Sequence, residues 1–509
     1  MKNILVIRKN TYFDSVTLMS LSEELKKLDE AENVMVTMAT AMNKELLQKE
    51  QLADASIEAC TENDLVIAAK VLDEVEEEDF IGLVDERLKG DKASGEKEEE
   101  VYATIKQAKA ADEDANMVVI SVPGEHAARE AKIALENGMN VMLFSDNVTL
   151  EEERSLKELA HEKELLVMGP DCGTAMINGI GLCFANKVAA GNIGIVGASG
   201  TGMQEIMVLI DRYGCGISNA IGVGGRDLKE AIGGIMMLDG LHMLEADEKT
   251  KVIVIVSKVP DEAVEQKLLE VIERDITKPV VIYYTTDDKK TTDLKKVVFA
   301  DSLLGAAQKA CELSCGKKPE EKMQQIAAFE QFADTQKYIR GLYCGGTVCA
   351  EAYYYLKQKA DEVYSNVTKD KAHMLADVFK SQGHTLLDLG DDFFTTGRAH
   401  PMIDPTIRLS RIKEECEDPE CAVILLDFEI GYGSNENPAG TTIDVIREGM
   451  ELAKARGREI KFVTYVLGTD VDMQNKRQQE KQLAECGCLI AESNLEAVKM
   501  ACRLIGLEE

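Results

Sequence analysis

A glycine-rich run in the middle of the chain has the composition of an anion-binding turn. Residues 194–202 read Gly-Ile-Val-Gly-Ala-Ser-Gly-Thr-Gly, which predicts a strand followed by a helix. Such a turn exposes backbone N–H groups at the N-terminus of the helix, which is the positive end of its dipole, and glycine lets an anion approach the backbone closely. The run matches neither a Walker loop nor the G-x-G-x-x-G fingerprint, and a tight turn with a Ser/Thr helix cap is the alternative. We expect phosphate to bind at Ser199, Gly200, Thr201 and Gly202.

A second run of the same kind lies in the last third of the chain. Residues 341–349 read Gly-Leu-Tyr-Cys-Gly-Gly-Thr-Val-Cys and lead into an expected helix from Ala350 to Lys357. If the two helix starts face each other, they would hold one phosphate or acyl phosphate from both sides without positive net charge. The phosphate-binding residues expected here are Gly345, Gly346 and Thr347.

A cluster of polar residues between 388 and 405 combines three early aspartates with an arginine, a histidine and a later aspartate. Arg398 could bind a carboxylate or phosphate in bidentate fashion, and His400 could donate or accept a proton, so both are candidate catalytic residues. The alternative is a loop whose polar groups satisfy its own backbone. We expect no metal site, although the three early acids, Asp388, Asp391 and Asp392, could bind Mg²⁺.

Two further loops follow predicted strands, at the edge where open α/β sheets bind ligands. Residues 222–227 read Gly-Val-Gly-Gly-Arg-Asp, and residues 169–173 read Gly-Pro-Asp-Cys-Gly. Cys172 could act as a nucleophile, but the sequence identifies no partner histidine. A shaped turn is therefore the simpler interpretation of residues 169–173.

The elements expected to position these loops are strands, which appear in the sequence as unbroken apolar runs. From Asn116 onward these runs alternate with predicted helices. This pattern predicts several doubly wound α/β domains with parallel sheets covered on both faces. A polar, helix-forming connector is expected within Lys317–Gln336. The expected segments are an N-terminal α/β region with an acidic linker (1–100), a Rossmann-type domain (101–190), a flavodoxin-like domain (191–316), a linker (317–337) and a C-terminal α/β domain (338–509).

Composition excludes several classes of function. The 509 residues carry a formal net charge of −33, which disfavours nucleic acid and anionic membranes as partners. The start of the chain shows no signal-peptide pattern, and no apolar stretch approaches about 18 residues, so we expect a cytoplasmic protein. The 13 cysteines include no C-x-x-C pair, which favours ordinary reduced thiols.

These motifs carry a resemblance to known families. The loops at 169–173, 197–201 and 221–225 resemble the ordered landmarks of the succinyl-CoA synthetase alpha subunit, and residues 341–349 are similar to a glycine-rich loop of its beta subunit. Over essentially the whole chain, the motifs at 14–16, 144–150, 197–202, 224–228 and 388–405 resemble the FdrA family, which includes AllF-like subunits of oxamate carbamoyltransferase. The resemblance implies a CoA-binding-type Rossmann fold followed by flavodoxin-like, succinyl-CoA-synthetase-like domains. The implied substrate-binding residues are Gly224, Gly225, Arg226, Asn147 and Asp171.

The chain departs from the ligase pattern at three places. Residues 8–14, after the first strand, contain no glycine where the ligase has its CoA loop, which argues against CoA binding there. Residues 283–296 contain no histidine where the ligase has its phosphorylated histidine. No stretch reads as an ATP-grasp nucleotide domain.

The FdrA resemblance implies one subunit of an oxamate carbamoyltransferase in allantoin catabolism. Inorganic phosphate, as a substrate, would attack the carbamoyl group of oxalurate to give oxamate and carbamoyl phosphate, with Arg398 on the oxamyl carboxylate and His400 as proton donor. Such a chain would assemble with other carbamoyltransferase subunits, and homo-oligomers are also possible. The alternatives are an ADP-forming acyl-CoA synthetase and a noncatalytic, phosphate-sensing subunit.

Overall fold

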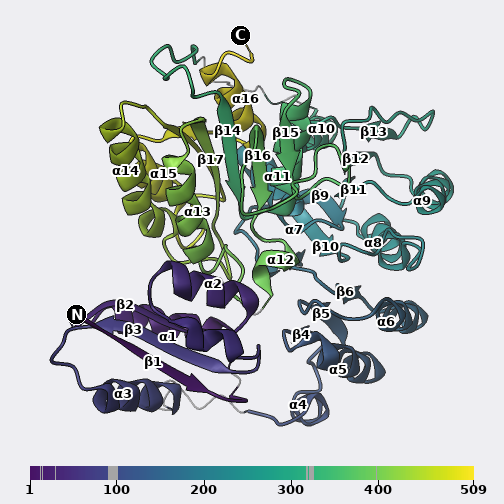
Figure 1. The fold of residues 1–509 in the computed structure, drawn as a ribbon. Coiled ribbons are helices and arrows are strands. Elements are labelled where there is room, and N and C mark those ends of the chain that lie inside the picture. Colours follow the sequence, from purple (N-terminus) through teal and green to yellow (C-terminus); the bar gives the residue numbers. More distant parts are fainter. Residues whose placement is uncertain are drawn as a thin grey trace. The chain divides into compact units, whose positions relative to one another are not determined.

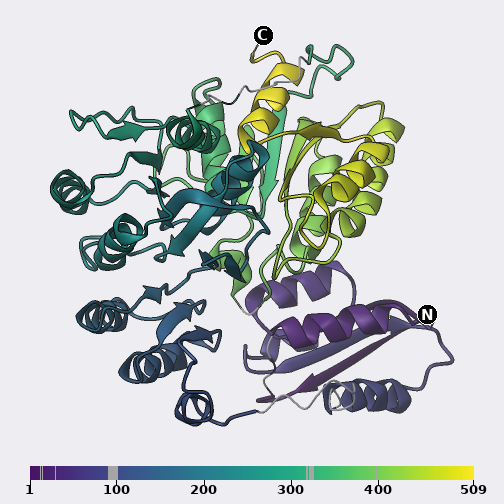
Figure 2. The same cartoon turned by 180° about the vertical axis from the view of Figure 1, so that it is seen from behind.

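The chain forms two units, and each is described by itself. The computed structural model describes residues 1–11, 13, 15–28, 30–89, 101–316, 319, 326–396 and 398–508. The N-terminal unit comprises Met1–Val101 together with Gly390–Asp404, and the main unit comprises Tyr102–Leu389 and Pro405–Glu509 (Figures 1 and 2). The sequence motif at 14–16 and the acidic stretch from 90 to 100 lie wholly or partly outside the described residues.

The N-terminal unit contains a three-stranded sheet in the order β1-β3-β2, in which β3 runs antiparallel to both neighbours. β3 is buried along almost its whole length because separate apolar clusters cover the two faces of the sheet. Its elements are β1 (Lys2–Arg8), α1 (Ser15–Lys26), β2 (Ala31–Met38), α2 (Ala41–Lys49), a 3₁₀ turn (Ala55–Ala59), β3 (Leu65–Val71), α3 (Glu77–Lys89) and α12 (Asp392–Thr395).

The N-terminal sheet differs in strand direction from the parallel sheets of the main unit. The sequence predicts doubly wound domains from Asn116 onward and an α/β region before them, and the sheet of that N-terminal region is antiparallel. The apolar run at Leu65–Val71 reads like a buried parallel strand because both of its faces are covered, which is the condition that removes the alternating pattern of an ordinary antiparallel strand.

The main unit begins with a small parallel sheet in the order β4-β5-β6. Helices α5 and α6 pack against each other beside it, and Thr149 caps α6 through a capping box with Glu152. The elements are α4 (Ile105–Ala111), β4 (Met117–Ile120), α5 (Gly124–Glu136), β5 (Asn140–Leu143), α6 (Leu150–Glu162) and β6 (Val167–Met168).

A seven-stranded sheet follows, in the order β13-β12-β11-β9-β10-β7-β8. The strands from β13 to β10 are parallel, whereas β7 pairs antiparallel with both β10 and β8. The elements are β7 (Thr174–Ile177), β8 (Ile180–Cys183), β9 (Ala190–Gly197), α7 (Gly200–Arg212), β10 (Ile217–Gly222), α8 (Ile235–Ala246), β11 (Val252–Lys258), α9 (Glu262–Asp275), β12 (Val280–Thr285), β13 (Val297–Phe299) and α10 (Leu303–Cys315).

The last sheet is six-stranded and parallel throughout, in the order β15-β16-β14-β17-β18-β19. Helices α11 and α16 pack together as one layer, and α13, α14 and α15 form another (Figure 1). The elements are β14 (Tyr338–Tyr343), α11 (Gly346–Lys357), β15 (Val363–Ser365), β16 (His384–Asp388), α13 (Thr406–Glu417), β17 (Cys421–Glu429), α14 (Pro438–Ala455), β18 (Lys461–Leu467), α15 (Lys476–Glu485), β19 (Leu489–Ala491) and α16 (Asn494–Leu504).

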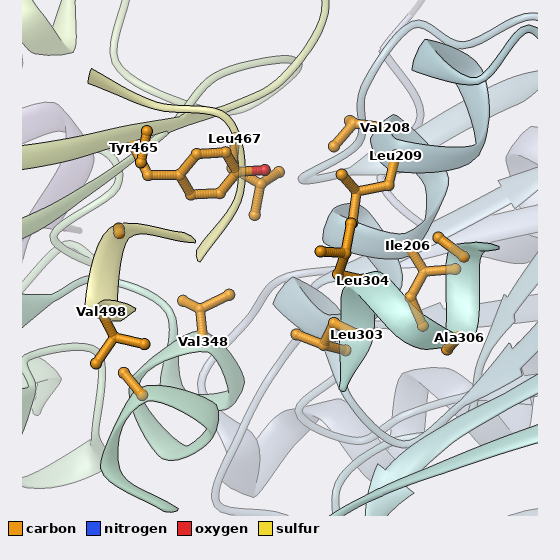
Figure 3. Close-up of a cluster of buried hydrophobic side chains, with 14 of the residues drawn as sticks. Ile206, Val208, Leu209, Leu303, Leu304, Ala306, Val348, Tyr465, Leu467 and Val498 are labelled. Carbon is orange, nitrogen blue, oxygen red and sulfur yellow. The ribbon is translucent and has the colours of Figure 1, made fainter. Parts of the chain in front are cut away.

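One buried apolar cluster joins the two large sheets of the main unit. Helices α7 and α10 from the seven-stranded sheet contribute to it, and so do α11 and α16 from the six-stranded sheet. Figure 3 shows Leu209 and Leu304 beside each other, together with Val348 from α11 and Val498 from α16. Because α7 and α11 each begin at one of the glycine-rich runs, this core fixes the positions of both runs.

Two elements differ from the sequence prediction. The apolar pattern of residues 228–237 favours a helix, but α8 begins only at Ile235, because Gly233 and Gly234 both have positive φ and cannot continue a right-handed helix. The hairpin of β7 and β8 was not predicted, and it joins the seven-stranded sheet although residues 174–183 were expected to belong to the preceding domain.

In the connector, residues 319 and 326–336 contain no helix, and its remaining residues lie outside the described ranges.

Acid should destabilise the main unit through His384, which begins β16. This side chain is 5% exposed, its Nδ1 accepts a hydrogen bond from the N–H of Ile339 at 3.1 Å, and burial together with Arg340 lowers its pKa from 6.5 to about 4. Stability from the neutral imidazole is thus present above pH 6.5 and lost as the pH falls through about 4, at most about 3 kcal/mol. We expect His384→Asn, which keeps an acceptor but cannot be protonated, to reduce the drop in thermal midpoint over this range. His126→Asn, at an exposed histidine, is the control.

Candidate functional site

The two glycine-rich runs meet in the main unit. Ser199 lies between β9 and α7, and Thr347 lies in the first turn of α11, and their hydroxyl oxygens are 2.5 Å apart. A Cβ added to Gly345 would lie 2.9 Å from the Thr201 methyl carbon, and one added to Gly202 would lie 3.0 Å from the Thr347 methyl carbon. The structure therefore places the starts of two helices from different sheets against each other, which is the condition that the sequence analysis sets for holding one phosphate from both sides.

Some of the N–H groups expected to bind phosphate already have acceptors. The Ser199 hydroxyl accepts a hydrogen bond from Gly202 N–H at 3.1 Å, which is the ordinary N-cap of α7. The Asp427 carboxylate accepts from Cys344 N–H at 2.8 Å and from Gly345 N–H at 2.9 Å. The Asp427 carboxylate is therefore the anion that binds these two N–H groups at the start of α11. An external anion would depend on the hydroxyls and on the remaining first-turn N–H groups, which no helix can satisfy internally.

A buried charged group lies directly behind the α11 loop. Arg408 pairs with Asp427 at 3.3 Å, and all of Arg408, Asp427 and Glu429 are at most 2% exposed. Burial and the neighbouring Asp427 raise the pKa of Glu429 well above its usual value. One oxygen of Glu429 has no hydrogen-bond partner and would lie 2.8 Å from a Cβ on Gly345. These acids are missing from the sequence prediction, although acids at the end of the apolar run 421–429 were a usable signal.

Two of the same buried acids, Asp427 and Glu429, also belong to a group of potential metal ligands. Among the described residues, the group of potential ligands whose atoms all lie within 4.8 Å of one another is Cys344, Asp427 and Glu429. Asp427 is already engaged by Arg408 and by two N–H groups. The three acids considered for Mg²⁺ form no such group, and Asp391 instead caps α12 by accepting from Phe393 N–H at 3.0 Å.

A buried polar network ties α7 to α11 beneath the paired loops. The Asn494 amide donates to Glu351 on α11 at 2.7 Å, and its backbone N–H lies 3.4 Å from an oxygen of Glu205 on α7. Tyr465 donates its hydroxyl to the same Glu205. Burial raises the pKa of Glu351 to about 7 and that of Glu205 above its usual value. The network holds the two helices in register, because neither acid can leave without exposing polar groups to an apolar core.

The expected substrate-binding residues also come together, at the carboxyl ends of β5, β6 and β10. Gly224 has φ +83°, and a Cβ there would lie 2.4 Å from the carbonyl oxygen of Pro170. A Cβ on Gly225 would lie 3.9 Å from a carboxylate oxygen of Asp171. Arg226 donates to the carbonyl of Val148 at 2.7 Å, next to Asn147 in the loop after β5. These residues follow the carboxyl ends of strands from two sheets, with β5 and β6 in the three-stranded sheet and β10 in the seven-stranded sheet. Substrate binding at this place stays a prediction.

A fully buried ion cluster supports this edge from below. Lys157 on α6 lies 2.8 Å from Glu153 and 2.9 Å from Asp227, and it donates to the carbonyl of Val223 at 2.9 Å. All three charged side chains are 0% exposed, and Arg226 lies 2.8 Å from the second oxygen of Glu153. The sequence analysis missed Lys157 and Glu153, because a Lys and a Glu in a charged helix look like surface residues.

Cys172 shows no sign of a nucleophilic role. It is 4% exposed, and burial raises the pKa of its thiol to about 12, whereas a nucleophile needs an accessible thiolate. Its neighbour Gly169 precedes a cis proline and has φ +122°. These features agree with the expectation of a shaped turn.

Arg398 and His400 lie in the N-terminal unit, whereas the two glycine-rich runs lie in the main unit. The Arg398 side chain is 7% exposed, its nearest charge partner is Asp404 at 3.9 Å, and its Nη1 has no hydrogen-bond partner. Burial lowers the pKa of His400 to about 4, so its ring is neutral at pH 7, and its Nδ1 accepts from Met402 N–H at 3.2 Å. Any proton that His400 donates must therefore come from the Nε2–H of a neutral ring.

Three family comparisons match separate segments. Residues 1–104 match "AllF, heavy metal-associated domain", residues 188–285 match "CoA binding domain", and residues 342–504 match "CoA-ligase". The CoA-binding match falls on the segment that the sequence analysis interpreted as flavodoxin-like rather than on 101–190. None of the described helices is both long and apolar enough to cross a membrane.

Individual relatives agree with these matches. "Uncharacterized protein YahF" of Escherichia coli (strain K12) is 48% identical over 497 residues, which is 96% of each chain. "Succinate--CoA ligase [ADP-forming] subunit alpha 1" of Archaeoglobus fulgidus is 29% identical over 187 residues, which is 36% of this chain and 62% of the relative. The apo structure of a dinucleotide-forming acetyl-coenzyme A synthetase 1 from Ca. Korarchaeum cryptofilum covers 82% of this chain and 87% of its own at 14% identity and a TM-score of 0.35.

The CoA-binding and CoA-ligase matches, together with the distant succinate–CoA ligase relative, show that the main unit is related to succinyl-CoA synthetases. The chain belongs to the FdrA family, with an AllF-type N-terminal domain followed by CoA-binding and CoA-ligase domains.

The name of the N-terminal domain implies a heavy metal, but its residues do not fit one. Residues 1–104 contain a single cysteine, Cys60, and no histidine. Soft metals are held by several thiolates or imidazoles, and Cys60 is buried in an apolar cluster. This copy of the domain therefore lacks the ligands for thiolate or imidazole metal binding.

Proposed function

We propose that the chain is a subunit of an oxamate carbamoyltransferase. A phosphate oxygen would attack the carbamoyl carbon of oxalurate, the C–N bond to the oxamyl group would break, and the departing nitrogen would take up a proton. The products are carbamoyl phosphate and oxamate. The observation that carries the proposal is the 2.5 Å contact between the Ser199 and Thr347 hydroxyls at two facing helix starts. Both hydroxyls could donate to a phosphate oxygen in place of each other.

Two further features support carbamoyl transfer to phosphate without CoA chemistry. The family carries an AllF-type domain, and residues 283–296 contain no histidine that could relay a phosphoryl group. Inorganic phosphate would be the second substrate, and no metal or CoA is required by this chemistry. Other subunits of the carbamoyltransferase would be its partners.

Substitution of Arg398 tests the assignment of the substrate carboxylate. In the enzyme assembled with its partner chains, Arg398→Ala should lower kcat/KM for oxalurate about a hundredfold, because a bidentate charged pair would be lost. Its unpartnered Nη1 motivates this role. Arg447→Ala, at an exposed arginine paired with Asp444, is the matched control and should leave turnover unchanged. Near-normal oxalurate turnover by Arg398→Ala would remove the assignment.

The second candidate is an ADP-forming acyl-CoA ligase, which the CoA-binding and CoA-ligase matches favour. The lack of glycine in residues 8–14 does not exclude CoA binding elsewhere in the chain. Residues 8–14 follow β1, which belongs to an antiparallel sheet and not to the parallel sheet of β4, so they do not occupy the position of a Rossmann CoA loop. The absence of a histidine in 283–296 still argues against the ligase.

A further inference from the structure

Three cysteines gather where helices α7 and α10 end. Cys315 is the last residue of α10, Cys311 lies one turn earlier, and Cys215 follows the end of α7. The sulfur atoms of Cys215 and Cys315 are 2.6 Å apart, although 100 residues separate them in the sequence. That is far closer than two unbonded sulfurs ordinarily approach, and a disulfide needs about 2.05 Å. The pair therefore needs little movement to become bonded.

The three thiols differ in access to solvent. Cys315 is exposed and Cys215 is partly exposed, whereas Cys311 is only 1% exposed. Burial raises the pKa of Cys311 strongly, and burial together with the hydrogen bond to Cys315 raises the pKa of Cys215. A reagent in solution would therefore meet Cys315 first.

We propose that Cys215 and Cys315 form a reversible disulfide by exchange with a small-molecule disulfide. The Cys315 thiolate attacks one sulfur of the reagent, which gives a mixed disulfide and releases the first small thiol. The Cys215 thiolate then attacks the Cys315 sulfur and releases the second small thiol. The two cysteines lose two protons and two electrons, and the small-molecule disulfide is reduced to two thiols.

The bond would fix the helix that carries the Ser199 loop. It closes a loop of about 100 residues between the end of α7 and the end of α10, two helices that already pack together. The N-terminal end of α10 is tied to α11, because Leu303 N–H donates to Glu351 at 2.8 Å. The oxidised form should be more resistant to heat, since the cross-link restricts the unfolded chain.

The test uses the full chain incubated with oxidised glutathione, followed by alkylation of the remaining thiols and peptide mapping by mass spectrometry. We expect a peptide pair joined through Cys215 and Cys315, two fewer reactive thiols among the 13, and a thermal midpoint several degrees higher that dithiothreitol reverses. Cys215→Ser should accumulate a glutathione adduct at Cys315, and Cys311→Ser should leave the disulfide unchanged.

The wild-type peptide map decides the matter even if a variant folds poorly. Alkylation of both Cys215 and Cys315 after excess oxidant would overturn the proposal. A link between Cys215 and Cys311 in the wild-type protein would overturn it equally, because the buried thiol and not the exposed one would then be the partner.

Discussion

Replacing Lys157 by methionine should destabilise the main unit by about 3–5 kcal/mol. Methionine preserves most of the volume but removes the ammonium that lies 2.8 Å from Glu153 and 2.9 Å from Asp227. Both carboxylates are 0% exposed, so they would be left with less charge compensation in the interior. Native-state hydrogen exchange of the α6 amides measures the loss as a fall in the opening free energy.

Arg154→Ala on the same helix is the matched control. Arg154 pairs with Glu158 at 2.8 Å, but both side chains are more than half exposed, and such surface pairs contribute about 0–1 kcal/mol. If Lys157→Met proved as mild as this control, the buried cluster would not be what supports the loop at Gly224.

Gly224→Ala should cost about 3 kcal/mol. The alanine Cβ would meet the Pro170 carbonyl oxygen at 2.4 Å, and the backbone at this residue has φ +83°, which L-residues rarely adopt. The clash involves backbone on both sides, so no side-chain rotation can relieve it. Hydrogen exchange at β10 and a urea-unfolding midpoint measure the effect.

Gly214→Ala separates the two causes. Gly214 has a similar φ of +73°, but no heavy atom lies within 4 Å of its Cβ position, so only the conformational cost of about 1 kcal/mol applies. Equal losses in the two variants would show that the close approach of residues 169–170 to Gly224 is not tight.

Much of the main unit could be predicted, because its parallel strands are buried on both faces and appear as short unbroken apolar runs. The hairpin of β7 and β8 escaped this pattern, although Asn178-Gly179 between apolar residues is a strong hairpin signal, and both residues have positive φ. The antiparallel N-terminal sheet escaped because direction of pairing depends on contacts between segments far apart in sequence.

The parts of the site that backbone conformation determines could be predicted from the sequence. The parts that depend on the burial of charged side chains could not. Glycine runs before helices indicated that the Ser199 and Thr347 loops are helix starts, and these loops do meet. Asp427 accepts hydrogen bonds from the N–H of Cys344 and from that of Gly345, which was expected to bind phosphate, and only the fold reveals this partner. Lys157 looks like any exposed lysine until α6 is packed against the loop that contains Asp227.

The most direct test of the proposed function is a coupled assay on the purified chain, alone and with its co-purifying partners. Oxalurate and phosphate are supplied, and carbamate kinase with ADP converts any carbamoyl phosphate into ATP. A parallel sample receives ATP, CoA and a panel of carboxylates. The account predicts ATP formation that requires both oxalurate and phosphate, and no CoA thioester. Thioester formation without oxalurate phosphorolysis would contradict it and identify the chain as an acyl-CoA ligase.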